Sequence, residues 1–335
     1  MPSGLYVHVP FCSRKCPYCD FYSVGALDLI PSWLEGTARE AALAGPGFLD
    51  SCGPFDTLYL GGGSPSLLTR ADLRALLASL APLLGAASLK EATIEANPDD
   101  VTADKALFWK EAGFTRVSLG AQSFDARWLH ASLERSHTPA ETFAAIEAVA
   151  KSGLNLSLDL IYGHPGQKPE EWAGDLDKAA SGPARHISAY MLSAPPGTPL
   201  GRAVADGVVK LPGEKMYAEL FEVTGQALEL RGFSRYEVSN HALEGFECLH
   251  NLKYWRREPY LGLGPSAHSF DGQRRLASVP SVRRWASALS RGERALAVSE
   301  VVTEEMARLE AVMLGLRMAE GLERSLVASS PKLGG

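Results

Sequence analysis

The sequence predicts an α/β protein in which parallel strands alternate with helices. Two observations support this class. Apolar, strand-like runs recur along the first 200 residues, and helical patterns with apolar spacing near 3.6 residues lie between them. Consecutive parallel strands joined by helical crossovers form either a doubly wound sheet or a barrel. Periodicity alone leaves both arrangements open.

The expected elements follow one another in six units. We predict strands at residues 5–10, 55–60, 91–96, 116–119, 155–161 and 186–192. Helices are expected at residues 71–84, 102–112, 139–152 and 169–180. These helical segments carry Pro or Thr near their starts, where both residue types favour helix initiation.

The regular alternation ends after the Pro-rich run at residues 195–199. We therefore expect a first domain at residues 1–205, a mixed α/β extension at 206–300, and a short helical region at 301–335. Further helices are predicted at residues 212–230 and 303–318. Residues 325–335 have little helix-specifying content and are expected to fray.

Composition narrows the functional classes. Hydrophobic residues make up 46% of the chain and charged residues 21%, which is typical of a globular protein with a sizeable core. The net charge of -6 argues against a nucleic-acid partner. The most apolar stretch, residues 75–87, is too short to span a bilayer and contains Pro82. Without a targeting segment at its start, the chain is expected to be cytoplasmic, and only transient contact with a membrane acceptor remains open.

Three cysteines near the start of the chain predict a metal centre. Cys12, Cys16 and Cys19 have the C-x3-C-x2-C spacing of a three-thiolate iron-sulfur site. In a four-iron cluster, three thiolates leave one iron open to a small molecule. The alternatives are zinc, a disulfide or unused thiols. No second Cys or His pair at matched spacing accompanies these residues, which disfavours zinc. The odd number of five Cys and the lack of a secretory signal disfavour disulfides. Cys52 and Cys248 stand alone and are expected to be ordinary packed thiols.

Polar residues gather where the predicted strands end. Gly61–Gly62–Gly63 follows the second strand, and its small residues would let backbone amides approach a ligand closely, although the triplet alone favours a tight turn. Glu95 ends the third strand, Gln122 follows the fourth, and Asp159 lies in the fifth. Two carboxylates and an amide around one axis suit a zwitterionic, hydroxyl-bearing ligand such as an amino acid joined to a ribose.

Taken together, these motifs resemble the radical S-adenosylmethionine (SAM) superfamily. Within it they resemble the group that contains HemW-type haem chaperones and oxygen-independent coproporphyrinogen III dehydrogenases (also called oxidases). The resemblance implies a partial (β/α)6 barrel with a smaller α-rich C-terminal region, a 4Fe-4S cluster on the three cysteines, and reductive cleavage of SAM to a 5'-deoxyadenosyl radical. The positions that match the family's SAM contacts are Tyr6, Gly62, Gly63, Glu95, Gln122, Arg135 and Asp159. The segment from Gln122 to Arg135 is one residue longer than the family pattern, which puts Arg135 in question.

Two features favour the chaperone branch of this group. The dehydrogenases carry a fourth Cys two residues beyond the third, where this chain has Phe21. The run His250–Asn–Leu–Lys–Tyr254–Trp255 fits the His-Asn-x-x-Tyr-Trp pattern of HemW-type proteins. By this resemblance the chain binds haem through His250, Tyr254 and Trp255 and delivers it to an unidentified acceptor protein, without dehydrogenase activity.

Three alternatives stay open at this point. His250 could be a structural histidine in an aromatic patch. The chain could be a coproporphyrinogen III dehydrogenase, or a radical enzyme with an unrelated substrate.

The resemblance also implies a small C-terminal module beyond the segment at residues 314–317, whereas the given sequence ends at Gly335.

Overall fold

The fold is that of a computed structural model, which describes residues 2–85, 89–324 and 326. Its strands are β1 (Ser3–Val9), β2 (Phe55–Gly62), β3 (Glu91–Ala96), β4 (Arg116–Gln122), β5 (Asn155–Tyr162), β6 (His186–Met191), β7 (Ser234–Arg235), β8 (Asn240–Ala242), β9 (Tyr260–Leu263), β10 (His268–Phe270), β11 (Arg274–Ser278) and β12 (Leu296–Val301). They form one sheet in the order β12-β11-β10-β9-β1-β2-β3-β4-β5-β6-β8-β7.

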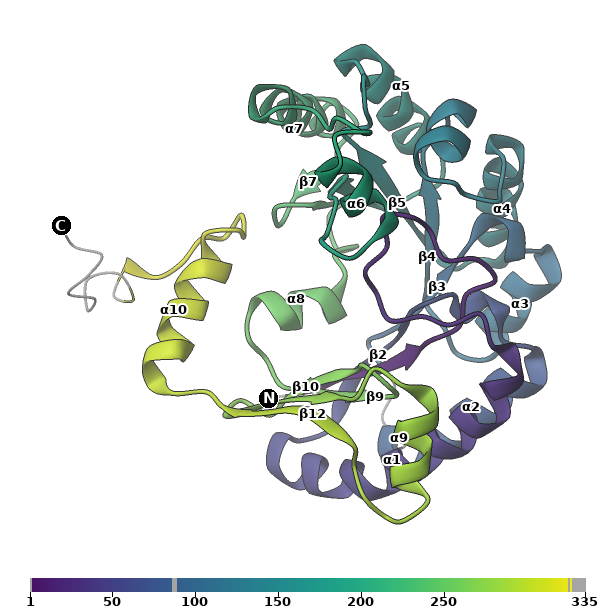
Figure 1. The fold of residues 1–335 in the computed structure, drawn as a ribbon, viewed down its shortest axis with the longest axis vertical. Helices are drawn as coiled ribbons and strands as arrows, with labels where there is room; N and C mark the ends of the chain where they lie inside the picture. The colour runs from purple at the N-terminus through teal and green to yellow at the C-terminus, as the bar shows by residue number, and fades with distance from the viewer. Residues whose placement is uncertain (1, 86–88, 325, 327–335) are drawn as a thin grey trace.

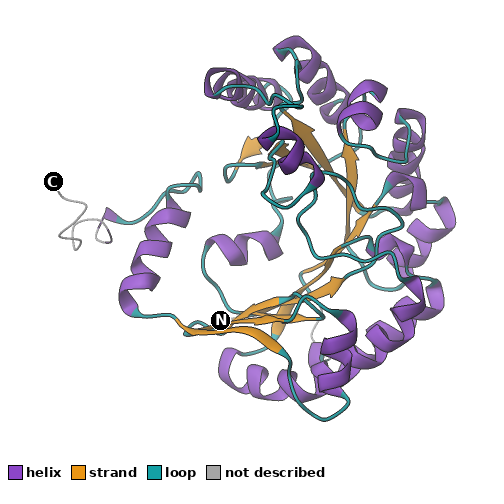
Figure 2. Ribbon diagram, viewed as in Figure 1, coloured by secondary structure: helices purple, strands orange, loops and turns teal. Residues whose placement is uncertain are grey.

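The six strands β1 to β6 are parallel and neighbour one another in sequence order. A doubly wound sheet would reverse its strand order, so this order decides for a partial barrel. The sheet curves, and the helices between its parallel strands, α1 to α5 in Figure 1, lie on the convex side (Figures 1 and 2). Its edge strands β12 and β7 do not pair with one another, so hydrogen bonds do not close the barrel across the part of the chain that is described.

The chain contains ten α-helices in its described part, and the first five, α1 to α5, connect the consecutive parallel strands β1 to β6. They are α1 (Ile30–Cys52), α2 (Arg70–Leu84), α3 (Ala103–Glu111), α4 (Pro139–Ser152), α5 (Pro169–Ala180), α6 (Pro199–Ala205), α7 (Glu214–Glu229), α8 (Leu249–Trp255), α9 (Val282–Leu289) and α10 (Glu304–Gly315). Capping residues in the local sequence fix the starts of several of these helices. Thr69 and Thr138 each form a capping box at the start of α2 and α4.

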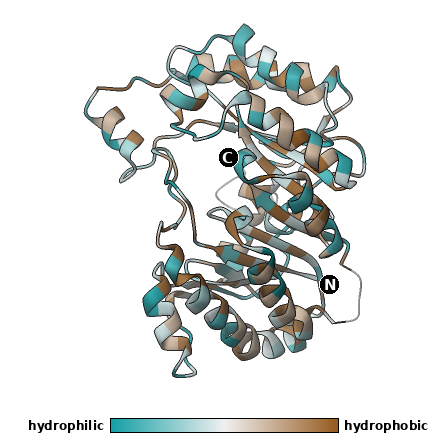
Figure 3. Cartoon of the chain, turned by 90° about the vertical axis from the view of Figure 1, so that its right-hand side faces the viewer, coloured by the Kyte–Doolittle hydropathy of each residue, from teal (hydrophilic) through white to brown (hydrophobic). Residues whose placement is uncertain are grey.

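The two faces of the barrel strands differ in chemistry because side chains alternate along a strand. Ile94, Val117 and Leu158 point outward and are fully or almost fully buried in the core between the strands and the helices. Figure 3 shows brown, hydrophobic segments along the strands. The inward positions of the same strands are mostly polar, so the barrel interior is a polar lumen.

The C-terminal part of the chain adds to both edges of the barrel sheet. β8 pairs with β6, and β9 pairs with β1. Between these edges, α8 lies on the concave side of the sheet (Figure 1). α8 packs against β1 and β2, and Cys248 and Asn251 at its start line the lumen.

The structure confirms the six expected strands and the helices between them, with ends that differ by at most three residues. It also contains α1, which the sequence pattern did not predict. Gly36 and Gly45 interrupt its pattern because packing is tight there: a Cβ at Gly36 would lie 2.4 Å from the Trp285 ring, and one at Gly45 would lie 2.2 Å from Leu83. Tertiary packing thus explains residues that locally disfavour a helix.

Two expectations concern the end of the chain and the membrane. The tail expected to fray, residues 325–335, lies outside the described residues except for Leu326. None of the helices in the described part of the chain has the length and apolar character needed to cross a membrane. The division at residues 205 and 300 stays a prediction.

Candidate functional site

The three motif cysteines lie on the loop that leaves the C-terminal end of β1. The amide of Cys19 donates to the carbonyl of Cys16 over 3.2 Å, which bends the loop back on itself. Neighbouring groups point at the sulfurs: Ser64 Oγ lies 3.6 Å from Cys12 Sγ, and Arg135 Nη1 lies 3.4 Å from Cys16 Sγ. All three thiols are free and partly exposed. The loop therefore presents three sulfurs, and polar side chains are directed at those of Cys12 and Cys16.

Arg135 follows an irregular segment of the chain. A π-helical turn spans Trp128–Ser132, and Glu134 has a left-handed φ of 49°. The guanidinium of Arg135 reaches Cys16 Sγ and donates through Nη2 to Asn97 Oδ1 over 2.5 Å. Its role as a SAM contact stays a prediction.

Glu95 and Asp159 are buried carboxylic acids in the lumen. Glu95 accepts hydrogen bonds from Tyr59 Oη at 2.9 Å and from the amide of Gly62 at 3.0 Å. Burial, and secondarily the charge of Asp159, raises the pKa of Glu95 to about 7. Asp159 accepts from Ser118 Oγ at 3.0 Å, and burial raises its pKa as well. Two buried acids of this kind would gain from a cationic ligand group between them.

The glycines after β2 are required by packing. Gly62 has a φ of 109°, and a Cβ there would lie 2.4 Å from the His8 ring. A Cβ at Gly63 would lie 2.5 Å from the carbonyl oxygen of Phe11. The glycines thus bring the turn against the loop of the cysteines, and the amide of Gly62 is already bonded to Glu95.

These residues surround one cavity of about 420 Å³. Gly62, Gly63, Glu95, Gln122, Arg135 and Asp159 all line it, together with Cys19. Gln122 does so from a left-handed backbone conformation, with a φ of 63°. Tyr6 is the exception among the predicted contacts. It hydrogen-bonds His8 Nδ1 over 3.1 Å and packs on Tyr59, behind the cavity wall.

Sequence reasoning missed the polar layer below these residues. Lumen-facing polar side chains of β3 to β6 are Thr93, Arg116, Ser118, Ser157, His186 and Ser188. Thr93 and Arg116 are register partners on adjacent strands. Thr93 Oγ1 and Arg116 Nη1 are buried and have no protein partner, so both are available to water or a ligand. Polar residues stand at every second position of these strands, and this alternation could have predicted a polar face. The sequence analysis used only the apolar residues between them.

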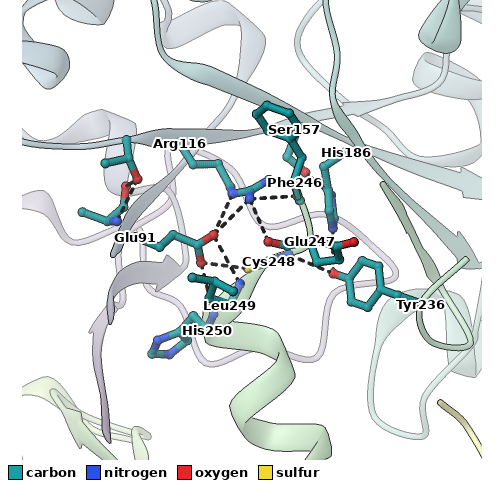
Figure 4. A network of polar contacts seen from close by, with 12 residues as sticks. Glu91, Arg116, Ser157, His186, Tyr236, Phe246, Glu247, Cys248, Leu249 and His250 are labelled. Atoms are coloured by element: carbon teal, nitrogen blue, oxygen red, sulfur yellow. Dashed lines mark hydrogen bonds and ion pairs between the residues drawn. The ribbon is translucent and has the colours of Figure 1, made fainter. Parts of the chain in front are cut away.

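Arg116, which lines the cavity, forms a buried ion pair with Glu91 behind the cavity wall (Figure 4). Nε and Nη2 of Arg116 lie 3.2 and 3.0 Å from Glu91 Oε2, and both side chains are 5% exposed. Nη2 of Arg116 also donates to the carbonyls of Phe246 and Glu247. Glu91 in turn accepts the amide of His250 at 3.1 Å. The pair therefore ties the start of α8 to the barrel.

His250 faces away from the cavity and is fully buried. Its Nδ1 hydrogen-bonds Thr57 Oγ1 over 2.8 Å, and its Nε2 hydrogen-bonds Tyr254 Oη over 2.9 Å. Burial lowers its pKa to about 3, so the ring is neutral at physiological pH. Neither nitrogen is free for iron in this conformation, which favours the structural alternative for His250. The haem role of His250, Tyr254 and Trp255 stays a prediction. From the same motif, Asn251 lines the cavity.

Comparison with known proteins agrees with this architecture. The sequence profile of the Radical SAM superfamily matches residues 6–179. The protein named "Heme chaperone HemW" from Mycobacterium tuberculosis is 37% identical over 326 residues, which cover 96% of this chain and 83% of that protein. Its namesake from Bacillus subtilis is 34% identical, with coverage of 96% and 85%.

Among solved structures, the fold matches coproporphyrinogen III oxidase (HemN) from Escherichia coli, described as a radical SAM enzyme. The TM-score is 0.81 at 22% identity, covering 95% of this chain and 76% of that one. At this identity the likeness supports the fold alone.

Proposed function

We propose that this chain, which belongs to the radical SAM superfamily and within it to the HemW family, is a haem chaperone that binds haem and delivers it to an acceptor protein. The observation that carries the proposal is the match to proteins named as haem chaperones along 96% of the chain. Phe21 supports it, because no fourth thiol stands beside the three motif cysteines.

The proposed resident groups are a 4Fe-4S cluster and SAM. Cys12, Cys16 and Cys19 would hold the cluster, with Arg135 and Ser64 directed at two of the sulfurs. Across the described residues, no three His, Cys, Asp or Glu side chains are gathered around one point as a single-ion site. The assignment therefore rests on the family and on the loop. When bound, the cluster and SAM together supply one-electron chemistry.

The cavity fits a zwitterionic ligand at its cluster end. Glu95 and Asp159 are buried acids that would pair with an ammonium group or accept from ribose hydroxyls. Arg135, which lines the same cavity, would face a carboxylate. We therefore assign SAM to the space lined by Gly62, Gly63, Glu95, Gln122, Arg135 and Asp159 and expect Tyr6 to act through Tyr59. An oxygen-sensitive cluster of this kind would place the chain in a reducing cytoplasm.

The test compares binding with turnover. Anaerobically reconstituted, cluster-loaded protein is titrated with hemin, and separately incubated with coproporphyrinogen III, SAM and a reductant. We expect a saturable Soret change and no protoporphyrinogen IX. Formation of protoporphyrinogen IX would overturn the chaperone proposal in favour of the dehydrogenase. Absence of hemin binding would refute haem as the cargo.

A further inference from the structure

The mouth of the cavity carries an exposed apolar surface. We call it the apolar lip and define it as Phe21, Tyr190 and Met191, which all line the cavity. Phe21 is 62% exposed, Met191 50% and Tyr190 41%. Single exposed apolar residues are ordinary on a protein surface, but three large ones at one opening mark a contact site for an apolar ligand.

The lip is assembled from two distant parts of the chain. Phe21 belongs to the loop of the motif cysteines, and Tyr190 and Met191 end β6. The cysteine loop is tied to the chain that follows β6, because the amide of Leu200, at the start of α6, donates to the carbonyl of Pro17 over 2.9 Å. Tyr18 also packs against the small apolar cluster around Leu192. The lip is therefore a supported surface and not the tip of a free loop.

We infer that haem docks on the apolar lip, with one face of its macrocycle on Phe21 and Met191, across the mouth of the cavity. This inference rests on the proposed function and gives its cargo a site. An aromatic ring and a thioether suit a flat, polarisable macrocycle. His250 offers no such surface, because it is buried and both its nitrogens are hydrogen-bonded.

The charge beside the lip suits the two carboxylates of haem. Lys15 is exposed, and its Nζ donates to the carbonyl of Phe21 over 3.2 Å. An ammonium group has three donors, so two remain for a propionate. Asp20 also lines the mouth and opposes carboxylates on its own side. Haem would therefore bind with its propionates toward Lys15.

The first test uses substitutions in cluster-loaded protein titrated anaerobically with hemin. Phe21→Ser and Met191→Ala should each weaken binding about ten- to fiftyfold, because each removes roughly 60 to 90 Å² of apolar contact from the ligand. Met191→Leu should bind like the wild type, since it keeps the apolar surface. Lys15→Gln should weaken binding severalfold and reduce its dependence on salt. The matched control is Leu230→Ala, which removes an 86% exposed side chain outside the cavity lining.

The second test needs no substitution. Hydrogen exchange of peptides that contain residues 20–22 and 189–193 should slow on addition of hemin, whereas the peptide at residues 250–255 should change little. If wild-type protein binds hemin but Phe21→Ser and Met191→Ala bind as tightly, and the lip peptides are not protected, the lip is refuted while the proposed function stands. If Met191→Leu loses as much as Met191→Ala, sulfur ligation replaces apolar contact. Absence of binding by wild-type protein refutes the proposed function itself.

Discussion

The Glu91–Arg116 pair should couple the barrel to the start of α8, and Arg116→Met tests this. The substitution keeps an unbranched apolar side chain but removes the guanidinium. It leaves the Glu91 carboxylate at 5% exposure without its cation, and it frees the carbonyls of Phe246 and Glu247, which had accepted at 2.9 and 3.1 Å. The loss of a buried partner is expensive because the remaining charge stays out of water.

The expected loss is about 3–5 kcal/mol for the unpaired buried carboxylate. Glu91 still accepts from the amides of Leu249 and His250 and from Cys248 Sγ, which places the value toward the lower end of that range. The double variant Glu91→Gln/Arg116→Met should recover roughly 1–3 kcal/mol of this loss, because the neutral amide needs no cation.

Urea unfolding followed by circular dichroism measures the loss, and hydrogen exchange at Leu249 and His250 reports the attachment of α8. The matched control is Arg127→Met, since Arg127 is 62% exposed and its ion pairs with Asp125 and Glu171 lie at the surface. That change should cost less than about 1 kcal/mol. If Arg116→Met costs no more than the control, or if the double variant is no more stable than Arg116→Met, the Glu91–Arg116 pair does not couple the barrel to α8.

Three further predictions concern the resident groups. Replacing Cys12, Cys16 or Cys19 with Ser should abolish the absorbance of the reconstituted cluster, whereas Cys52→Ser and Cys248→Ser should retain it; an equal requirement for either of the last two would contradict the three-thiolate site. Affinity for SAM should rise about eightfold from pH 6 to pH 7.5, because the Glu95 carboxyl, whose pKa is about 7, becomes the anion that pairs with the ammonium group. Calorimetry on Glu95→Gln should show a flat profile over this range, and an unchanged slope would assign the titration elsewhere. Gln122→Ala and Asp159→Ala should each lower SAM affinity roughly five- to hundredfold, with the cluster intact, since each leaves a ligand hydrogen bond unmade; unchanged calorimetric affinity in both would mean that SAM binds outside this cavity.

Local sequence patterns were sufficient for the repeating units and for the cluster loop. Strands such as β3 were predicted to the residue, because their apolar runs and the helices between them are set by neighbours close in the chain. The spacing of Cys12, Cys16 and Cys19 is likewise a local property. Motifs of this kind also carried the family resemblance, which the comparisons confirm.

Other features were decided only by contacts between distant residues. Gly36 and Gly45 disfavour a helix by local propensity. Their presence in α1 is explained by the close packing of Trp285 and Leu83 against them. The environment of His250 depends on Thr57, almost 200 residues earlier, and that contact occupies a nitrogen that the motif alone would assign to iron. The strand order excluded the doubly wound sheet that periodicity had left open.

By itself the sequence determined the α/β units, the cysteine loop and the family, because these depend on spacing along the chain. Only the tertiary structure decided that polar faces of β3 to β6 line one lumen, that Glu91 and Arg116 meet behind its wall, and that Phe21 and Met191 flank its mouth. The physical reason is that burial and hydrogen-bond partners are properties of three-dimensional neighbours, and a strand's pattern does not say which of its faces meets the core or a cavity.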